Sequence, residues 1–274
     1  MYIRKFVLTL ALGLWSLAAV TNAQVQGPDP TEASIAADGP FAVSTQSLAR
    51  GNGFGGGTVY SPNAAGTYGV ISFCPGFTAT QSSVAVMGRR LATHGFVVVT
   101  INTNSILDFP ASRATQLQAA LNAVAALTTG PVAGKVDGSR RAVTGHSMGG
   151  GGALQALRQN ASLRAGVGLA PWSTDVRNFS AIQSPVAMVG GSIDEIAPVS
   201  THAGWFYLSI NQTEKLLAVI RNVNHSFQSA NPANQPASKY QVAWMKRWVD
   251  GDTRYSPFLV TDARLSTFSS TAPF

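Results

Sequence analysis

One serine in the sequence occupies a setting that can turn its hydroxyl group into a nucleophile. Residues 145–149 read Gly-His-Ser-Met-Gly, the Gly-x-Ser-x-Gly pattern of a sharp turn between a strand and a helix. An apolar strand precedes the turn at 141–144, and a helix-forming run follows at 153–159. Small residues permit a strained serine backbone, and the helix N-terminus leaves free N–H groups beside Ser147. The alternative is a glycine-rich turn with an incidental serine, but strand, turn and helix together favour the nucleophile.

A base and an acid for this serine are found later in the chain. A serine hydroxyl is a weak nucleophile unless a base takes its proton and an acid orients that base. Enzymes built on this turn place the serine first, then the acid, then the histidine, which leaves His202 and His225. His202 falls in a predicted helix, whereas His225 follows a strand, so His225 is the better base. Asp194 is the first candidate for the acid, although it could instead cap a helix, and Asp175 is the second.

The oxyanion that forms when a serine attacks a carbonyl group needs two N–H donors. In this serine turn one donor is the residue after the nucleophile, here Met148, and the other comes from the loop after an earlier strand. Residues 75–77, Pro-Gly-Phe, are the natural source. We expect Phe77 to supply its N–H and to offer its ring to the substrate, unless 75–76 is only a turn.

The elements that position these residues alternate between strands and helices. This alternation predicts an α/β domain with a mostly parallel central sheet and helices on both faces. The candidate residues then follow the carboxyl ends of strands, where such sites assemble. We expect a surface segment at 27–40, strands at 41–47, 58–60, 68–74, 96–101, 141–144, 165–169, 185–189 and, as the last strand, 216–220, and helices at 82–94, 111–127, 153–159, 201–210 and 240–249.

Composition and the first residues indicate an exported globular protein. With 45% hydrophobic and 11% charged residues, the chain of 274 residues can bury a core. Residues 1–23 have a basic start, an apolar run and a small-residue end, which predicts a signal peptide and a single domain at 24–274. The formal net charge is +7, but no basic run with interleaved aromatic residues predicts nucleic-acid binding. Cys74 is the only cysteine, so no internal disulfide can form, and we expect a buried, unreactive thiol.

From about residue 27 to its end, the chain resembles the bacterial polyester hydrolases, the cutinase-like and poly(ethylene terephthalate)-degrading α/β-hydrolases. The resemblance is carried by Gly39-Pro40-Phe41, Pro75-Gly76-Phe77-Thr78, His94-Gly95-Phe96, Gly145 to Gly152, Ala170-Pro171-Trp172, Asp194 to Val199, Val242 to Arg247 and Asp252-Thr253-Arg254-Tyr255.

The resemblance implies a role for each residue at the site. It implies Ser147 as nucleophile, His225 as base, Asp194 as acid, and an oxyanion hole of Phe77 and Met148. It also implies a shallow cleft in which the rings of Trp172 and Phe77 clamp an aromatic or acyl unit. The cleft would be lined by Phe77, Thr78, His146, Met148, Trp172, Ile196 and Ser226. His202 and Phe206 resemble the pair that packs beneath the clamp tryptophan, so we expect no proton transfer by His202.

The sequence departs from the family at positions that stabilise many of its members. Val260 and Ala272 stand where many relatives have a disulfide, and Gly191 and Phe227 stand where one subgroup has a second. Ser192 and Arg221 replace two residues that bind calcium in thermophilic relatives. We therefore expect no bound metal or cofactor, and a mesophilic enzyme of lower heat resistance.

The function predicted is that of a secreted serine esterase that hydrolyses polyester bonds, in cutin-like polymers and in aromatic ones such as poly(ethylene terephthalate), through an acyl-enzyme on Ser147. Its partners would be polymeric or small esters, and we expect an extracellular or periplasmic monomer. We expect no nucleic-acid partner and no stable association with membranes. Because 107–111 and 224–238 show no helical pattern, we predict an open cleft without a lid domain. A secreted lipase or carboxylesterase acting on acylglycerols would use the same triad and is the first alternative. A surface-binding protein on an inactive hydrolase fold is the second, and the intact Ser147, Asp194 and His225 argue against it.

Overall fold

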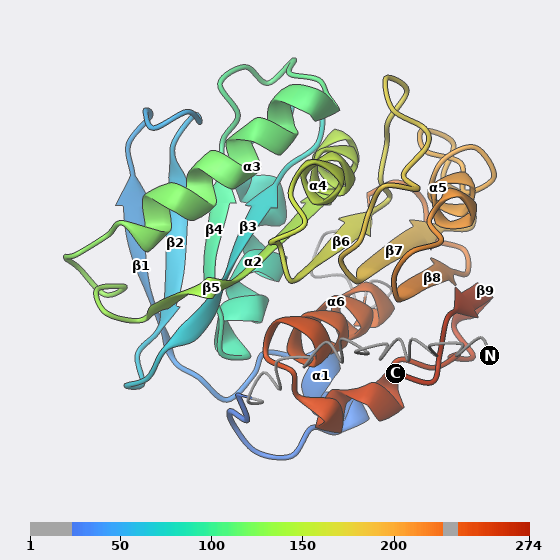
Figure 1. Ribbon diagram of the computed structural model, residues 1–274. Helices are drawn as coiled ribbons and strands as arrows, with labels where there is room; N and C mark the ends of the chain where they lie inside the picture. The colour runs from blue at the N-terminus through green and yellow to red at the C-terminus, as the bar shows by residue number, and fades with distance from the viewer. Residues whose placement is uncertain (1–23, 227–234) are drawn as a thin grey trace, which may run out of the picture.

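The computed structural model describes residues 24–226 and 235–274, so the predicted signal peptide and Phe227 lie outside the described residues. The described residues form one nine-stranded sheet in the order β1-β2-β4-β3-β5-β6-β7-β8-β9 (Figure 1). Its strands are Val43–Leu48 (β1), Gly57–Pro62 (β2), Tyr68–Cys74 (β3), Val97–Ile101 (β4), Val136–His146 (β5), Ala165–Leu169 (β6), Val186–Gly191 (β7), Lys215–Ile220 (β8) and Leu265–Ser270 (β9).

The middle of the sheet is parallel and its margins are antiparallel. Strands β4, β3, β5, β6, β7 and β8 pair in parallel, while β1, β2 and β9 pair antiparallel with their neighbours. Every residue of β3, β4 and β6 is buried. Continuous burial is expected for strands that helices cover on both faces.

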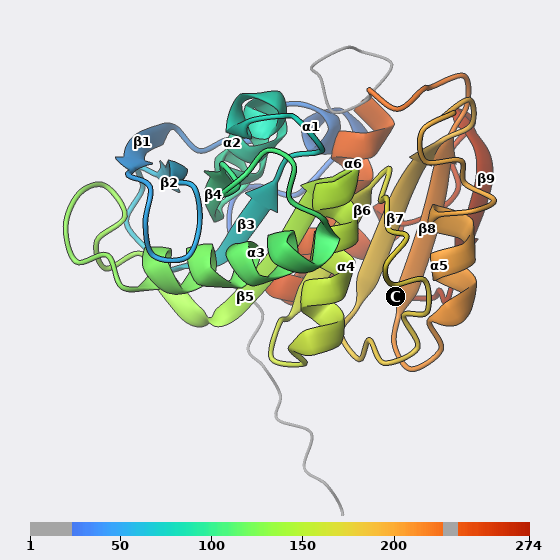
Figure 2. The same ribbon diagram turned by 90° about the horizontal axis from the view of Figure 1, so that it is seen from above.

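Helices cover both faces of this sheet, as Figure 2 shows. On one face lie α3 (Pro110–Ala125), α4 (Met148–Gln159) and α5 (Ala203–Ser209). On the other face lie α1 (Glu32–Ala36), α2 (Ala85–Thr93) and α6 (Gln235–Val249). Two buried hydrophobic clusters fill the space between the sheet and its two helical layers. The predicted α/β fold with helices on both faces is confirmed.

Four details of the predicted elements are wrong. The last strand is β9 rather than 216–220, and the segment 27–40 contains α1. Strand β5 begins at Val136, so it includes residues assigned to the connection before 141. Helix α6 begins at Gln235, inside the predicted loop 224–238. Among the described residues, no helix is both long and apolar enough to cross a membrane.

The sheet brings the candidate residues to one edge. Neighbouring parallel strands β3, β5, β6, β7 and β8 all end there, at Cys74, His146, Leu169, Gly191 and Ile220. The loop 75–78, Ser147, Trp172, Asp194 and His225 follow these ends directly. Residues separated by up to 150 positions in sequence therefore meet at this edge, as the rule for parallel sheets predicts.

Candidate active site

Ser147 occupies a strained turn between β5 and α4. Its backbone has φ 55° and ψ −122°, a conformation that costs a non-glycine residue on the order of 1–3 kcal/mol. Three hydrogen bonds hold it: its N–H donates to the Leu169 carbonyl at 2.9 Å, and its carbonyl accepts from the N–H groups of Gly151 and Trp172 at 3.0 and 2.9 Å. A Cβ built on Gly145 would lie 2.1 Å from the backbone of Gly149. The turn therefore requires glycine there to bring α4 against β5.

Asp194 and His225 form a hydrogen-bonded pair. Nδ1 of His225 lies 2.8 Å from Oδ2 of Asp194. Oδ1 of Asp194 accepts from the backbone N–H groups of Ile196 and Ala197 at 2.9 and 2.8 Å. Burial would raise the pKa of Asp194, but the hydrogen bonds from His225 and these two N–H groups hold it below its ordinary value of 3.8. The carboxylate therefore stays charged at neutral pH and fixes the imidazole.

Asp175, the second candidate for the acid, lies in a different set of contacts. Its carboxylate accepts from the Gln155 side chain at 3.0 Å and from the Ser173 hydroxyl at 2.9 Å. The structure therefore pairs His225 with Asp194 and not with Asp175.

His146 supports His225 from the residue before the serine. Its Nε2 lies 2.8 Å from the His225 carbonyl oxygen, and the two ring centroids are 4.8 Å apart. Burial first, and then the charge of His225, lowers the pKa of His146 to about 4. His146 is therefore neutral at physiological pH and does not add a charge beside His225.

The loop after β3 lies against Ser147. A Cβ built on Gly76 would be 3.0 Å from Cβ of Ser147. Phe77 follows and is 45% exposed, and its N–H has no hydrogen-bond partner within 24–226 and 235–274. Met148 is the first residue of α4, a position whose N–H cannot bond within the helix. Both predicted donors of the oxyanion hole thus flank Ser147.

Arg113 of α3 is a residue that the sequence analysis missed. Its side chain is fully buried and donates to the carbonyl oxygens of Pro75, Ile106 and Asp108 at 3.0, 3.0 and 2.7 Å. The guanidinium therefore ties the loop that carries Phe77 to the loop 106–108. The available signal was that Arg113 is the only charged residue in the helix Pro110–Ala125.

Trp172 lies next to Ser147, to whose carbonyl its N–H donates, and its ring contacts two other aromatic rings. Its ring stacks on His202 with centroids 6.0 Å apart and planes at 24°, and His202 meets Phe206 edge to face at 5.7 Å. Phe109, which the sequence analysis did not single out, is 54% exposed and lies 6.3 Å from the Trp172 centroid. Burial and the charge of Arg177 lower the pKa of His202, which favours its neutral form. The expected packing beneath Trp172 is present.

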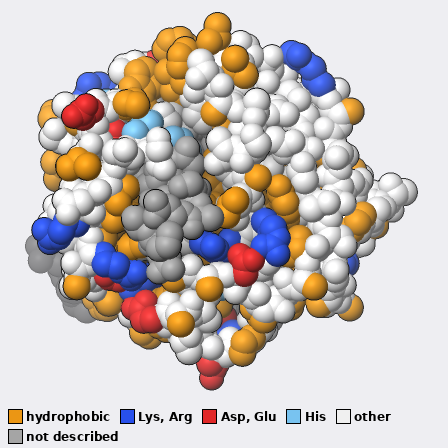
Figure 3. Space-filling model, turned by 180° about the vertical axis from the view of Figure 1, so that it is seen from behind, with side chains coloured by type: hydrophobic (Ala, Val, Ile, Leu, Met, Phe, Trp, Pro, Cys, Tyr) orange, Lys and Arg blue, Asp and Glu red, His pale blue; other side chains and the backbone are white. Residues whose placement is uncertain are grey.

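His225 opens into a cavity of about 360 Å³. Ile196 and Ser226, both predicted to contact substrate, line it together with Ile193, Glu195, Asn224 and His225. Thr78 lies in the loop after β3, where its hydroxyl donates to the Phe77 carbonyl at 2.7 Å. Figure 3 shows histidine surface on this side of the molecule, with hydrophobic side chains gathered above and beside it.

The positions at which the sequence analysis expected no disulfide or calcium ligand have their own contacts. A Cβ built on Gly191 would lie 2.2 Å from the Val223 carbonyl oxygen, so the backbone leaves no room for a side chain there. The Ser192 hydroxyl accepts from the Asn222 N–H at 2.8 Å, and Arg221 donates to the Leu265 carbonyl at 2.9 Å. Val260 is 47% exposed.

The sheet order and the serine turn define the α/β-hydrolase class. Residues 18–272 match the PETase family, described as PET hydrolase-like, and the chain belongs to that family. It is 42% identical to a cutinase of Thermobifida fusca over 97% of this chain and 91% of that protein. It is 43% identical to cutinase 1 of Thermobifida cellulosilytica over 93% of this chain and all of that protein. A bis(hydroxyethyl) terephthalate hydrolase of Streptomyces coelicolor is 45% identical over 88% of this chain and 78% of that protein.

Proposed function

We propose that this protein is a secreted serine esterase that hydrolyses the ester bonds of polyesters through an acyl-enzyme on Ser147. One observation carries the proposal: Ser147 stands on its strained turn, and the ring of the adjacent His146 lies 4.8 Å from the His225 imidazole, whose Nδ1 is 2.8 Å from Asp194. Membership of the PET hydrolase-like family supports the ester as the bond attacked.

In the first half of the reaction, Oγ of Ser147 attacks the ester carbonyl carbon while Nε2 of His225 takes the hydroxyl proton. Asp194 accepts from Nδ1–H of His225, which fixes the tautomer and stabilises the imidazolium. The N–H groups of Phe77 and Met148 stabilise the oxyanion. The carbon–oxygen bond to the alcohol then breaks, and the alcohol leaves with the proton from His225.

In the second half, His225 takes a proton from a water molecule that attacks the acyl carbon on Ser147. The tetrahedral intermediate collapses with cleavage of the bond to Oγ, and His225 returns the proton to the serine. The carboxylic acid product leaves. Each oxyanion donor contributes about 3–4 kcal/mol of transition-state stabilisation in comparable sites. The rate of the reaction therefore depends on the position of the loop 75–77, which carries the Phe77 N–H.

We propose that the polymer substrate is aromatic or cutin-like. The indole of Trp172 is only partly buried and offers a flat surface on which a terephthalate ring can stack. Relatives named cutinase and bis(hydroxyethyl) terephthalate hydrolase support this reading over a lipase. The roles of Thr78, Ile196 and Ser226 in holding the substrate belong to the same proposal.

The test is product release from an amorphous poly(ethylene terephthalate) film, with tributyrin and a long-chain triglyceride run in parallel. We expect terephthalate-type products from the wild type and none from Ser147→Ala. Strong turnover of the long-chain triglyceride without release from the film would contradict the polyester reading while leaving the triad in place.

We propose further that residues 1–23 are removed on export and that the mature protein, beginning near Gln24, acts as a monomer without metal or cofactor. The basic start and apolar run of residues 1–23 support export. N-terminal sequencing of the protein from culture medium, and its mass in solution by light scattering, test these two points.

A further inference from the structure

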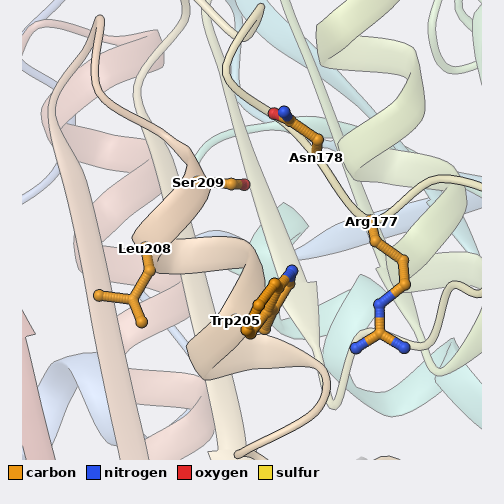
Figure 4. Close-up of a pocket in the computed structure, with 5 residues that line it drawn as sticks. All are labelled: Arg177, Asn178, Trp205, Leu208 and Ser209. Carbon is orange, nitrogen blue, oxygen red and sulfur yellow. The ribbon is translucent and has the colours of Figure 1, made fainter.

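A second pocket, of about 510 Å³, lies outside the residues proposed for catalysis. Figure 4 shows its two walls: Arg177 and Asn178 come from the loop after Trp172, and Trp205, Leu208 and Ser209 come from α5. The Trp205 ring lies on the side of α5 that faces Arg177.

The α5 wall of the pocket exposes apolar side chains to solvent. Ala203 and Phe206 of this helix are buried against the core. Trp205 and Leu208 are instead 53% and 76% exposed, and their spacing of three residues places them next to each other on the helix surface. Adjoining exposed apolar side chains mark a site of interaction more often than single ones do.

The opposite wall supplies hydrogen-bond donors. The Arg177 guanidinium lies 5.8 Å from the Trp205 centroid and donates through Nη2 to the Thr201 carbonyl at 2.6 Å. No carboxylate in the described part of the chain pairs with it. Asn178 uses its carbonyl oxygen to accept from the Ser180 N–H at 2.9 Å, and its amide N–H groups form no hydrogen bond within the described residues. A flat apolar surface beside cationic and amide donors fits an aromatic ring flanked by ester carbonyls.

Two contacts between the same two segments connect the pocket with Trp172. The loop 172–178 and the start of α5 first meet where Trp172 stacks on His202 at 6.0 Å. They meet again where Arg177 lies over Trp205 at 5.8 Å. Trp205 is three residues beyond His202, a rise of about 5 Å along a helix. A chain of repeating aryl ester units can therefore contact both places, whereas a small ester bound at Ser147 cannot.

We propose that the Trp205 pocket is an accessory binding site for an aryl dicarboxylate ester unit of a polyester chain, separate from the unit being hydrolysed. This inference rests on the proposed polyesterase function. Trp205 stacks on the ring, Leu208 extends the apolar surface, and Arg177 and Asn178 donate to ester carbonyl oxygens. The site increases the time that the enzyme spends on the polymer and takes no part in the chemical step.

The experiment compares Trp205→Ala with the wild type and with Val86→Ala, a control at an exposed valine of α2 on the other face of the sheet. Adsorption to poly(ethylene terephthalate) particles is measured in the Ser147→Ala background, so that the surface stays intact. Product release from film and kcat/KM on soluble p-nitrophenyl butyrate are measured in the active background. Trp205→Phe tests rescue by another ring.

We expect Trp205→Ala to lower affinity for the particles and release from film by roughly ten-fold, with soluble-ester kcat/KM unchanged. Trp205→Phe should recover most of the loss, and Val86→Ala should behave as wild type. Unchanged adsorption in Trp205→Ala would overturn the proposal. An equal loss on the soluble ester would also overturn it, since Trp205 would then act by supporting His202 and Trp172. A wild type that releases nothing from film would refute the proposed polyesterase function itself, and this result differs from the two outcomes above.

Discussion

Replacing Arg113 with methionine should slow catalysis more than its effect on folding explains. Methionine keeps most of the volume but removes the guanidinium donor from the carbonyl oxygens of Pro75, Ile106 and Asp108. Of these, only Ile106 keeps another donor within the described residues, the Thr78 N–H at 2.9 Å. Each unsatisfied buried acceptor costs about 1–3 kcal/mol, partly offset because a buried charge is also removed. We expect a net loss of about 2–4 kcal/mol in the free energy of unfolding.

The catalytic effect follows from the position of Phe77, two residues after Pro75. Complete loss of an oxyanion donor lowers kcat by about 10²–10³. A loop that is loosened rather than removed should lower kcat by roughly 10–100-fold and leave KM close to the wild-type value. Steady-state kinetics on p-nitrophenyl butyrate, at a temperature where both proteins are folded by circular dichroism, measure the effect.

Arg140 provides the matched control. It is also buried, and it contacts Asp137, Asp250 and the Thr67 carbonyl from the amino-terminal half of β5. Arg140→Met should destabilise the protein and leave kcat unchanged. The reasoning is refuted if Arg113→Met is folded with kcat within about two-fold of the wild type. It is equally refuted if Arg140→Met loses as much kcat.

Three further predictions concern ionisation. Burial lowers the pKa of His94 and His146 to about 4 from 6.5, so the unfolded chain binds more protons between these values and stability falls as pH drops. Urea unfolding should show that the free energy of unfolding falls by about 2 kcal/mol per histidine between about pH 7 and pH 5. The variant His94→Gln should lose about half of this pH dependence. A free energy of unfolding that does not change over this range would contradict the lowered pKa values. Asp194→Asn should lower kcat on soluble esters by roughly 10⁴-fold because the imidazole loses its orienting carboxylate; a loss below about ten-fold would show that another group orients the imidazole. Burial raises the pKa of Cys74 to about 11, so a thiol reagent at neutral pH should label it only in denaturant, and rapid labelling of the native protein would show the thiol to be accessible.

The elements that sequence patterns predicted best are those with continuous apolar runs between turn residues. Strands β3 and β6 have the expected bounds because every residue in them is buried. Strand β9 was missed because Leu265–Ser270 has few apolar residues and pairs only at the margin of the sheet. Helix α1 is five residues long, too short for a periodic pattern, and is held by a capping box at Thr31.

The site also contains residues that sequence patterns predict and residues that they do not. Residues that follow strand ends, such as Ser147 and Asp194, could be found from chain order alone, because a parallel sheet brings those ends together. The role of Arg113 could not, since its three acceptors lie in loops up to 38 positions away in sequence. The pocket at Trp205 also depends on how α5 and the loop 172–178 meet, which no local pattern encodes.

The most direct test of the central claim is covalent labelling by diethyl p-nitrophenyl phosphate, followed by peptide mass spectrometry and an ester assay on the same sample. The account predicts one diethylphosphoryl group per chain, on the peptide that carries Ser147, with loss of activity in proportion to labelling. Ser147→Ala should be neither labelled nor active. Labelling at another residue, or ester hydrolysis that survives in Ser147→Ala, would contradict the assignment of Ser147 as the nucleophile.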